Sequence, residues 1–186
     1  MVLASVAFSI AAFSIAALLS GLYLLGKDKG KNSDKTLGSI NIMVGIALFI
    51  SSLLLFITTP FGTGAPAANV ELGFSVLQVF FAFVWIAFGL ALLYGWDVKF
   101  VGSMALLLFV YNAIAFVLLP WKWSAAFTTV GLWITEIAMF TYLLDEVGFF
   151  ALSHGKLKAS VQGAFLILSA IASIALAIVV GGVFPL

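Results

Sequence analysis

Residues 129–140 read TVGLWITEIAMF and lie inside a hydrophobic run of about 20 residues, the length that an α-helix needs to cross a bilayer. Glu136 falls near the middle of this run, and we expect it to be the only charged residue deep within an apolar segment. A carboxyl group at that depth costs about 3 kcal/mol or more, so it usually faces a protein interior or a wet cavity. One helix face of the run carries a hydroxyl, the acid and two aromatic rings, at Thr129, Trp133, Glu136 and Phe140. We therefore predict that the other helices are arranged around this face.

The composition is that of an integral membrane protein. Of the 186 residues, 65% are hydrophobic and only 8% are charged, whereas soluble domains carry about 25% charged residues. The apolar runs are long and continuous rather than alternating, which predicts spanning helices and argues against an outer-membrane barrel. The chain has no cysteine, which excludes disulfides and thiolate metal sites.

The hydrophobic runs predict an all-α, single-domain bundle of six transmembrane helices. The connections between the runs are short, so consecutive helices should be antiparallel neighbours. The predicted spans cover residues of about 2–25, 37–58, 72–94, 100–119, 125–144 and 161–184.

The lysines predict the orientation of these spans. Seven lie in the first, third and fifth loops, and the second and fourth loops carry only Lys122. Because basic loops stay in the cytoplasm, we expect both termini to lie outside it, in a multi-pass protein of the cytoplasmic (inner) membrane. The seven are Lys27, Lys29, Lys31, Lys35, Lys99, Lys156 and Lys158.

Catalytic motifs are absent from the sequence. It contains no phosphate-binding loop, dinucleotide fingerprint, zinc motif or nucleophile elbow, and it has a single histidine. We therefore expect neither an enzyme nor a cofactor nor a metal site. Glu136 itself allows two interpretations: it is a functional group that contacts a solute such as an amide or urea, or it is a neutral acid that holds two helices together.

An aromatic stripe and a glutamine are further candidates. Phe81, Trp85 and Phe88 share one face of the third span, where aromatic side chains serve either packing or a narrow slot for a flat neutral molecule. Gln162 lies near the start of the sixth span and is either a polar contact for a solute or an ordinary interfacial residue.

Four short segments of the chain form a recognisable set. They are 20–27 (SGLYLLGK), 41–45 (NIMVG), 81–85 (FAFVW) with Gly89, Gly95 and Asp97, and 161–163 (VQG). These segments resemble the AmiS/UreI family of urea and short-chain amide channels. The third span is similar to that family's Phe-Gly-Phe-Thr-Tyr pattern and to the Gly and Gly-Leu-Asp that follow it.

The resemblance implies a passive channel in a hexameric ring, in which each protomer carries its own pore. Family members lead urea or amides to a cytoplasmic urease or amidase. By motif position, Phe81 and Trp85 would line the constriction, and Gln162 would match a pore-side residue of the sixth span. With a gap of two residues, Trp133 and Phe140 match two pore tryptophans.

The chain also departs from the family pattern. Glu136 takes the place of a third pore aromatic, Val84 replaces a threonine, and Ala91-Leu92 replaces a pair of asparagines. The first loop is longer, and the histidine-rich external loops of acid-gated members are absent. These departures argue against gating by external acid. A channel with a carboxyl group at its waist would also suit amides, ammonium-like cations or protonated solutes.

We therefore expect a channel for small neutral polar solutes, urea or short-chain amides, that lies in the lipid bilayer and binds no nucleic acid. Two alternatives remain open at the level of the sequence: a proton-coupled small-solute carrier that uses Glu136, and a non-catalytic membrane scaffold subunit. The predicted pore and substrate-binding residues are Phe81, Trp85, Phe88, Trp133, Glu136, Phe140 and Gln162.

Overall fold

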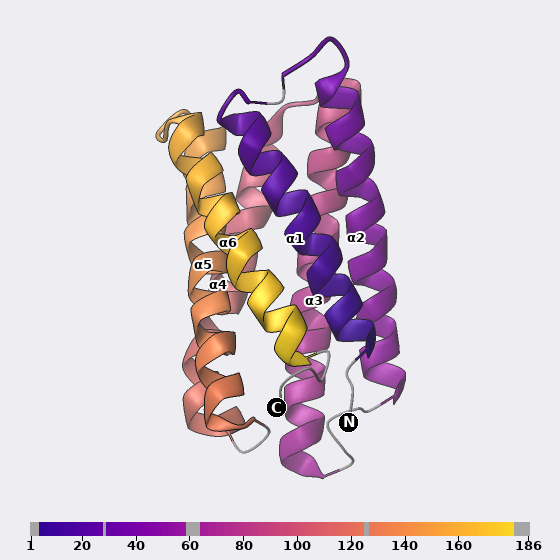
Figure 1. Cartoon of the computed structure of the whole chain (residues 1–186), viewed down its shortest axis with the longest axis vertical. Coiled ribbons are helices and arrows are strands. Elements are labelled where there is room, and N and C mark those ends of the chain that lie inside the picture. The colour runs from indigo at the N-terminus through magenta and orange to yellow at the C-terminus, as the bar shows by residue number, and fades with distance from the viewer. Residues whose placement is uncertain (1–3, 28, 59–63, 125–126, 181–186) are drawn as a thin grey trace.

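The computed structural model describes residues 4–27, 29–58, 64–124 and 127–180. Every regular element in these residues is helical, so the prediction of an all-α bundle is confirmed for the described part of the chain (Figure 1). The elements are α1 (Ala4–Leu24), α2 (Ser33–Thr58), α3 (Ala65–Tyr94), α4 (Val98–Leu118), the π-helical turn η1 (Leu119–Trp123), α5 (Thr129–Ser153) and α6 (Ala159–Val180).

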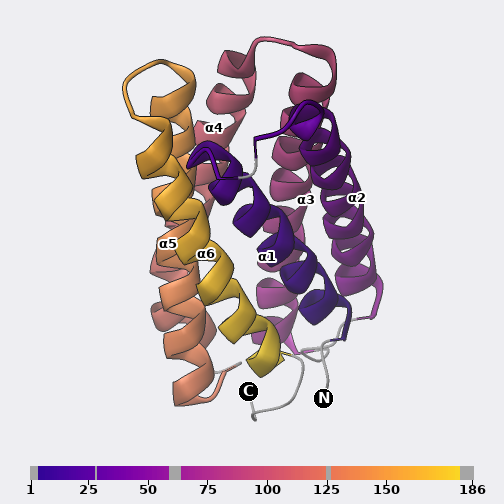
Figure 2. The same ribbon diagram turned by 45° about the horizontal axis from the view of Figure 1, so that its top comes forward.

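The helices form a closed ring. Each helix packs against the next one in the chain, and α6 returns to pack along α1. Figures 1 and 2 show α1 and α6 side by side from both directions, while α4 and α5 pair on one side and α2 and α3 on the other. This arrangement leaves one shared interior, which all six helices can reach.

Two glycine pairs bring helices of the ring into close contact. A Cβ added at Gly21 of α1 would lie 2.8 Å from the Gly163 carbonyl of α6, and one added at Gly163 would lie equally close to Gly21. Gly38 of α2 and Gly89 of α3 have the same reciprocal relation, at 2.7 and 2.5 Å. Small residues of this kind let helix backbones approach each other within a membrane.

Local signals explain several helix ends. Gly95 ends α3 in the left-handed conformation, with φ of 69°, and its N–H donates to the Ala91 carbonyl. Asp97 then begins α4, since its side chain accepts a hydrogen bond from the Lys99 N–H at 2.9 Å. Thr128 begins α5 in the same way by accepting from the Gly131 N–H at 3.1 Å.

The predicted boundaries fail mainly in α5. The predicted fifth span, 125–144, was too short at its carboxyl end, because the helix continues to Ser153 through residues that were assigned to a polar loop. The apolar residues 147–152 extend the buried helix past Asp145 and Glu146. At α3 the predicted start at residue 72 was also late, since that helix begins at Ala65 with a proline in its first turn. Residues 2–3, 125–126 and 181–184 of the predicted spans lie outside the described residues.

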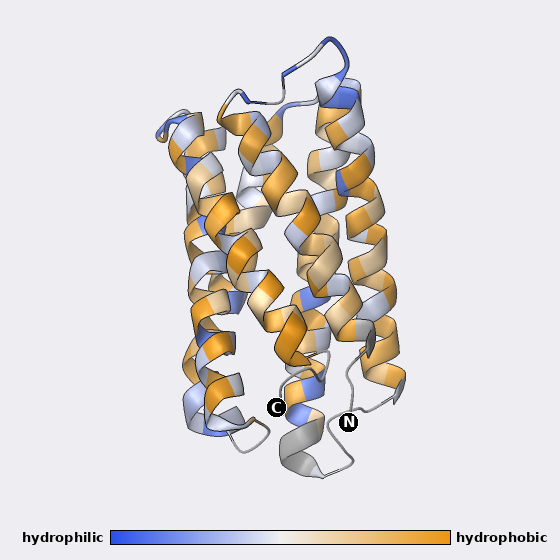
Figure 3. Ribbon diagram, in the orientation of Figure 1, coloured by the Kyte–Doolittle hydropathy of each residue, from blue (hydrophilic) through white to orange (hydrophobic). Residues whose placement is uncertain are grey.

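Five helices among the described residues are long and apolar enough to cross a membrane, namely α1, α2, α3, α4 with η1, and α6. Hydrophobic residues cover these helices along their length, and hydrophilic ones gather around the loop between α1 and α2 (Figure 3). The chain is thus a multi-pass membrane protein. The helix α5 is not among the five; it contains Glu136, Asp145 and Glu146.

The two ends of the ring differ in charge. The first residues of α1 and the last of α6 lie at the same end of the bundle (Figure 1). The α1–α2, α3–α4 and α5–α6 connections lie at the opposite end, and these connections and the adjoining helix starts carry the seven lysines named above. We call this second end the lysine end.

Candidate functional site

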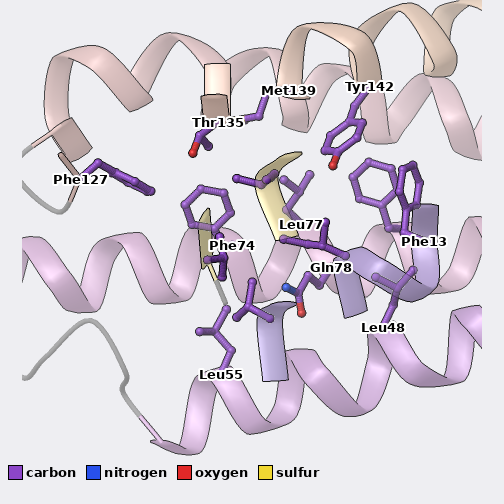
Figure 4. A pocket seen from close by; sticks show the side chains of 15 residues that line it. Phe13, Leu48, Leu55, Phe74, Leu77, Gln78, Phe127, Thr135, Met139 and Tyr142 are labelled. Carbon is purple, nitrogen blue, oxygen red and sulfur yellow. The ribbon is translucent and has the colours of Figure 1, made fainter. Parts of the chain in front are cut away.

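Two cavities lie inside the ring of helices. The first has a volume of about 70 Å³, and side chains from α1, α2, α3, α5 and α6 converge on it (Figure 4). The second has a volume of about 50 Å³ and is lined from α1, α3, α4, α5 and α6. Each volume exceeds the roughly 10–15 Å³ that one water molecule needs.

The two cavities follow one another along the axis of the bundle. On α5 the first cavity is lined at Thr135, Met139 and Tyr142, and the second at Asp145, Glu146 and Phe149. The linings of α3 and α6 run in the same order, and the two cavities share Phe13 and Phe81. The second cavity therefore lies nearer the lysine end.

An aromatic cluster separates the two cavities. We call it the aromatic wall; it consists of Phe13 of α1, Phe81 and Trp85 of α3, and Tyr142 of α5. The Phe13 ring meets the other three edge-on, with centroids 5.5 Å away at Phe81, 5.6 Å at Trp85 and 5.1 Å at Tyr142. Phe81 and Tyr142 are themselves 5.4 Å apart. Mutual edge contacts of this kind hold the rings in place between the two cavities.

The first cavity is almost entirely apolar. Its polar contributors are Gln78, Thr135 and Tyr142. The Thr135 hydroxyl donates to the Gly131 carbonyl of its own helix at 2.7 Å, and the Tyr142 hydroxyl lies 2.6 Å from that of Ser173 on α6. The Thr135 and Tyr142 hydroxyls therefore already have hydrogen-bond partners within the protein. The Gln78 side-chain oxygen has none among the described residues.

The second cavity contains two buried carboxyl groups in succession. Asp145 is 7% exposed and Glu146 is 3% exposed. Asn112 of α4 holds Glu146 by donating from its amide to both carboxylate oxygens, at 3.2 and 3.4 Å. Gln162 of α6 donates to the Asp145 backbone carbonyl at 3.1 Å. The expectation that Glu136 is the only charged residue deep in the bundle is therefore wrong.

The Asp145 carboxylate has no hydrogen-bond partner within the described residues. The Ser169 hydroxyl of α6 interacts with this carboxyl group, although the geometry of the two falls short of a regular hydrogen bond. The Gln162 side-chain oxygen is likewise unpartnered, although that residue is fully buried. An unpaired buried polar group carries its full desolvation cost, about 1–3 kcal/mol and more when it is charged.

The structure brings together four of the seven residues predicted for the site. Phe81, Trp85, Phe88 and Gln162 all line the second cavity, and Phe81 also lines the first. The Phe88 ring extends the aromatic lining toward Phe149 of α5, with ring centroids 5.0 Å apart.

The three predicted residues of α5 lie elsewhere. Trp133 is 60% exposed and Phe140 is 52% exposed on the outer surface of the ring. Glu136 is half-buried and lines neither interior cavity. The prediction that the helices are arranged around this face is wrong, because α5 turns its opposite side, through Thr135 and Met139, toward the interior.

Sequence reasoning missed Asp145 and Glu146. They were assigned to a solvated loop because they are the first charged residues after a long apolar run. The apolar residues 147–152 that follow them were the available signal. Spacings of three and four residues also link Thr135, Met139, Tyr142 and Glu146 on one helix face, which is the face that lines both cavities.

Taken together, the ring and its interior define a helical membrane protein with two separate cavities that follow one another inside the bundle. Comparison of the chain with protein-family models, with curated proteins and with solved structures found no match.

Proposed function

We propose that the protein is a channel for passive movement of small polar solutes, urea or short-chain amides, across the cytoplasmic membrane, and that it is not an enzyme. The observation that carries the proposal is the pair of cavities in line inside one ring of helices, separated only by the aromatic wall.

The chemistry of the two cavities suits such solutes. A flat amide can pass between aromatic rings, which narrow a pore and strip water from the solute. Urea and amides carry several N–H donors, and the second cavity offers oxygens of Asp145 and Gln162 that lack donors. The solute would thus exchange its hydration for hydrogen bonds that the protein leaves open.

The resemblance to the AmiS/UreI family supports the same function. That resemblance assigned Phe81, Trp85 and Gln162 to the pore, and all three line the second cavity. It does not extend to α5, where Tyr142, Asp145 and Glu146 contribute to the interior in place of Trp133, Glu136 and Phe140.

In the proposed orientation the lysine end faces the cytoplasm and both termini lie outside it. The helix α5 would be the sixth membrane-spanning helix, with its acids turned toward the interior at Asp145 and Glu146. By the family resemblance the protein would form a homohexamer, in which the outer face of α5 meets either lipid or a neighbouring protomer.

Stopped-flow shrinkage and swelling of proteoliposomes with urea and acetamide tests this function. The variant Phe81→Trp adds bulk to the aromatic wall, and Phe83→Trp makes the same change two residues away, at a side chain that is 52% exposed on the outside. We expect fast uptake by the native protein without a proton gradient, a reduction of about tenfold in Phe81→Trp, and native flux in Phe83→Trp. Native protein, monodisperse by gel filtration, that takes up neither solute faster than empty liposomes would overturn the proposal.

A proton-coupled carrier is the second candidate, and the buried pair of Asp145 and Glu146 is the observation that favours it. A carrier requires flux that follows a pH gradient, whereas a channel conducts without one. Uptake that rises with an imposed gradient and disappears in Asp145→Asn would establish the carrier.

A scaffold subunit is favoured only by the exposed aromatic residues on the outer face of α5, such as Trp133. It would show no flux by itself and would require a second protein chain for its stability.

A further inference from the structure

The second cavity has two acids among its lining residues and no base. Asp145 and Glu146 both contribute to the lining, and none of the residues that line it is a lysine, an arginine or a histidine. A buried carboxylate without a positive partner is costly, since the protein interior replaces little of its hydration.

The nearby amide nitrogens each already donate to the protein. The Gln162 amide donates to the Asp145 backbone carbonyl, and the Asn112 amide donates to Glu146. The unpartnered side-chain atoms that remain around the acid pair are all oxygens, namely both carboxylate oxygens of Asp145, the side-chain carbonyl oxygens of Gln162 and Asn112, and the Ser169 hydroxyl. Apart from the Ser169 hydroxyl, which can itself donate, these atoms are acceptors, so an occupant that satisfies them has to bring hydrogen-bond donors, and a positive charge on it would compensate the negative charge of the acids.

A small nitrogen cation fits these requirements better than a metal ion does. Ammonium and methylammonium carry one positive charge and three or four N–H donors. The described residues contain no group of three or more acidic, histidine or cysteine side chains that could hold a metal ion. Ca²⁺ takes six to eight oxygen ligands, and Mg²⁺ takes an octahedral set of six that usually includes several water molecules.

We propose that the second cavity is a binding site for a small primary ammonium cation, ammonium or methylammonium, with the Asp145 carboxylate as its main ligand. Glu146 adds negative charge, and the Gln162 oxygen accepts one of the N–H groups. The inference deepens the proposed function, on which it rests for access to the cavity. It also implies that such cations compete with urea and amides for the same chamber.

Thermal unfolding of the purified protein in detergent tests the site without a transport assay. A ligand that binds only the folded state stabilises it, and at ten times its Kd we expect a rise in Tm of about 4 °C. Methylammonium chloride is compared with sodium chloride and with tetramethylammonium chloride at equal ionic strength. Tetramethylammonium carries the same charge but no N–H donor.

We expect methylammonium alone to raise the Tm of the native protein. The rise should be absent in Asp145→Asn and unchanged in Glu136→Gln, which neutralises a half-buried carboxyl of the same helix that lines neither cavity. If Asp145→Asn does not fold, Glu146→Gln serves in its place, with an expected weakening of binding of at least tenfold. A shift that sodium reproduces, a shift that persists in the variants of the acid pair, or no shift at 100 mM would overturn the inference.

The flux assay separates the failure of this inference from the failure of the proposed function. Urea flux that methylammonium inhibits in the native protein, but not in Asp145→Asn, supports both. Urea flux with no methylammonium shift in Tm overturns the inference and leaves the channel standing. A methylammonium-specific shift without urea or acetamide flux overturns the channel and leaves the site standing.

Discussion

The two faces of α5 carry opposite roles, although both are largely apolar. The outer face contains Trp133 and Phe140, each more than half exposed. The inner face contains Thr135 and Met139, both 1% exposed, and leads to the acid pair. In a soluble helix the polar side would identify the exposed face, but lipid accepts apolar side chains on the outside as readily as the core does. Burial therefore shows which face lines the interior, and the chemical prominence of a residue such as Glu136 does not.

The comparison also concerns the carboxyl groups. Glu136 is half-buried, and its neighbours Trp133, Ile137 and Phe140 lie on the surface of the ring. Asp145 and Glu146 are buried, and Glu146 accepts a hydrogen bond from Asn112 of α4. A carboxyl that faces a shared interior can act on a solute. One that faces outward acts only on lipid or on a neighbouring protein.

The largest expected effect on stability comes from Gly148 on the inner face. A Cβ added there would collide with the Gln162 side-chain oxygen, because α5 and α6 are in direct contact at this point. We expect Gly148→Leu to cost about 3 kcal/mol or more through overpacking and displaced hydrogen bonds. Gel filtration in detergent should show aggregated or heterogeneous protein.

The neighbouring substitution Val147→Leu provides the control, since Val147 is 39% exposed. It should leave the protein monodisperse. Equal behaviour of the two variants would contradict the assigned rotation of α5.

A second pair of variants compares lost volume on the two faces. Met139→Ala removes a side chain that is 1% exposed and lines the first cavity, so we expect a cost of about 2–5 kcal/mol. Ile137→Ala removes one that is 58% exposed and should cost less than about 1 kcal/mol. Thermal unfolding in detergent measures both costs. A lower Tm for Ile137→Ala than for Met139→Ala would contradict the assignment of Met139 to the inner face and Ile137 to the outer face.

The smallest expected effect concerns the Tyr142 hydroxyl. Tyr142→Phe keeps the ring in the aromatic wall but removes the hydrogen bond to Ser173, at a cost of about 1 kcal/mol. Urea flux should stay within about twofold of native, because the width of the constriction is set by the ring. A tenfold loss of flux at unchanged Tm would instead assign the hydroxyl a direct contact with the solute.

Much of this arrangement could be predicted from the sequence. Continuous apolar runs predicted the helices, and short connections predicted consecutive neighbours in the ring. On α3, Phe81, Trp85 and Phe88 were placed on one face by their spacing, and that face points inward.

The rotation of α5 could not be predicted in the same way. Its apolar residues surround the helix on all sides, so spacings of three and four residues fit two different faces, and the face that carries Glu136 was predicted to point inward. The acid pair was lost for a related reason, because a charged residue at the end of an apolar run resembles the start of a loop. The burial of the acid pair becomes evident from the packing of α4 and α6 against α5, where Asn112 and Gln162 donate hydrogen bonds to Glu146 and to the Asp145 backbone carbonyl.

The most direct test of the interior path uses the absence of cysteine from the chain. Thr135→Cys places a thiol in the first cavity, and Ile137→Cys places one two residues away on the outer face. Urea flux is measured in proteoliposomes before and after treatment with methyl methanethiosulfonate, and mass spectrometry confirms that each variant is modified. A path inside the ring predicts that modification blocks flux in Thr135→Cys and leaves flux unchanged in Ile137→Cys. An interior path would be contradicted if modification blocked urea flux in Ile137→Cys and left flux unimpaired in fully modified Thr135→Cys.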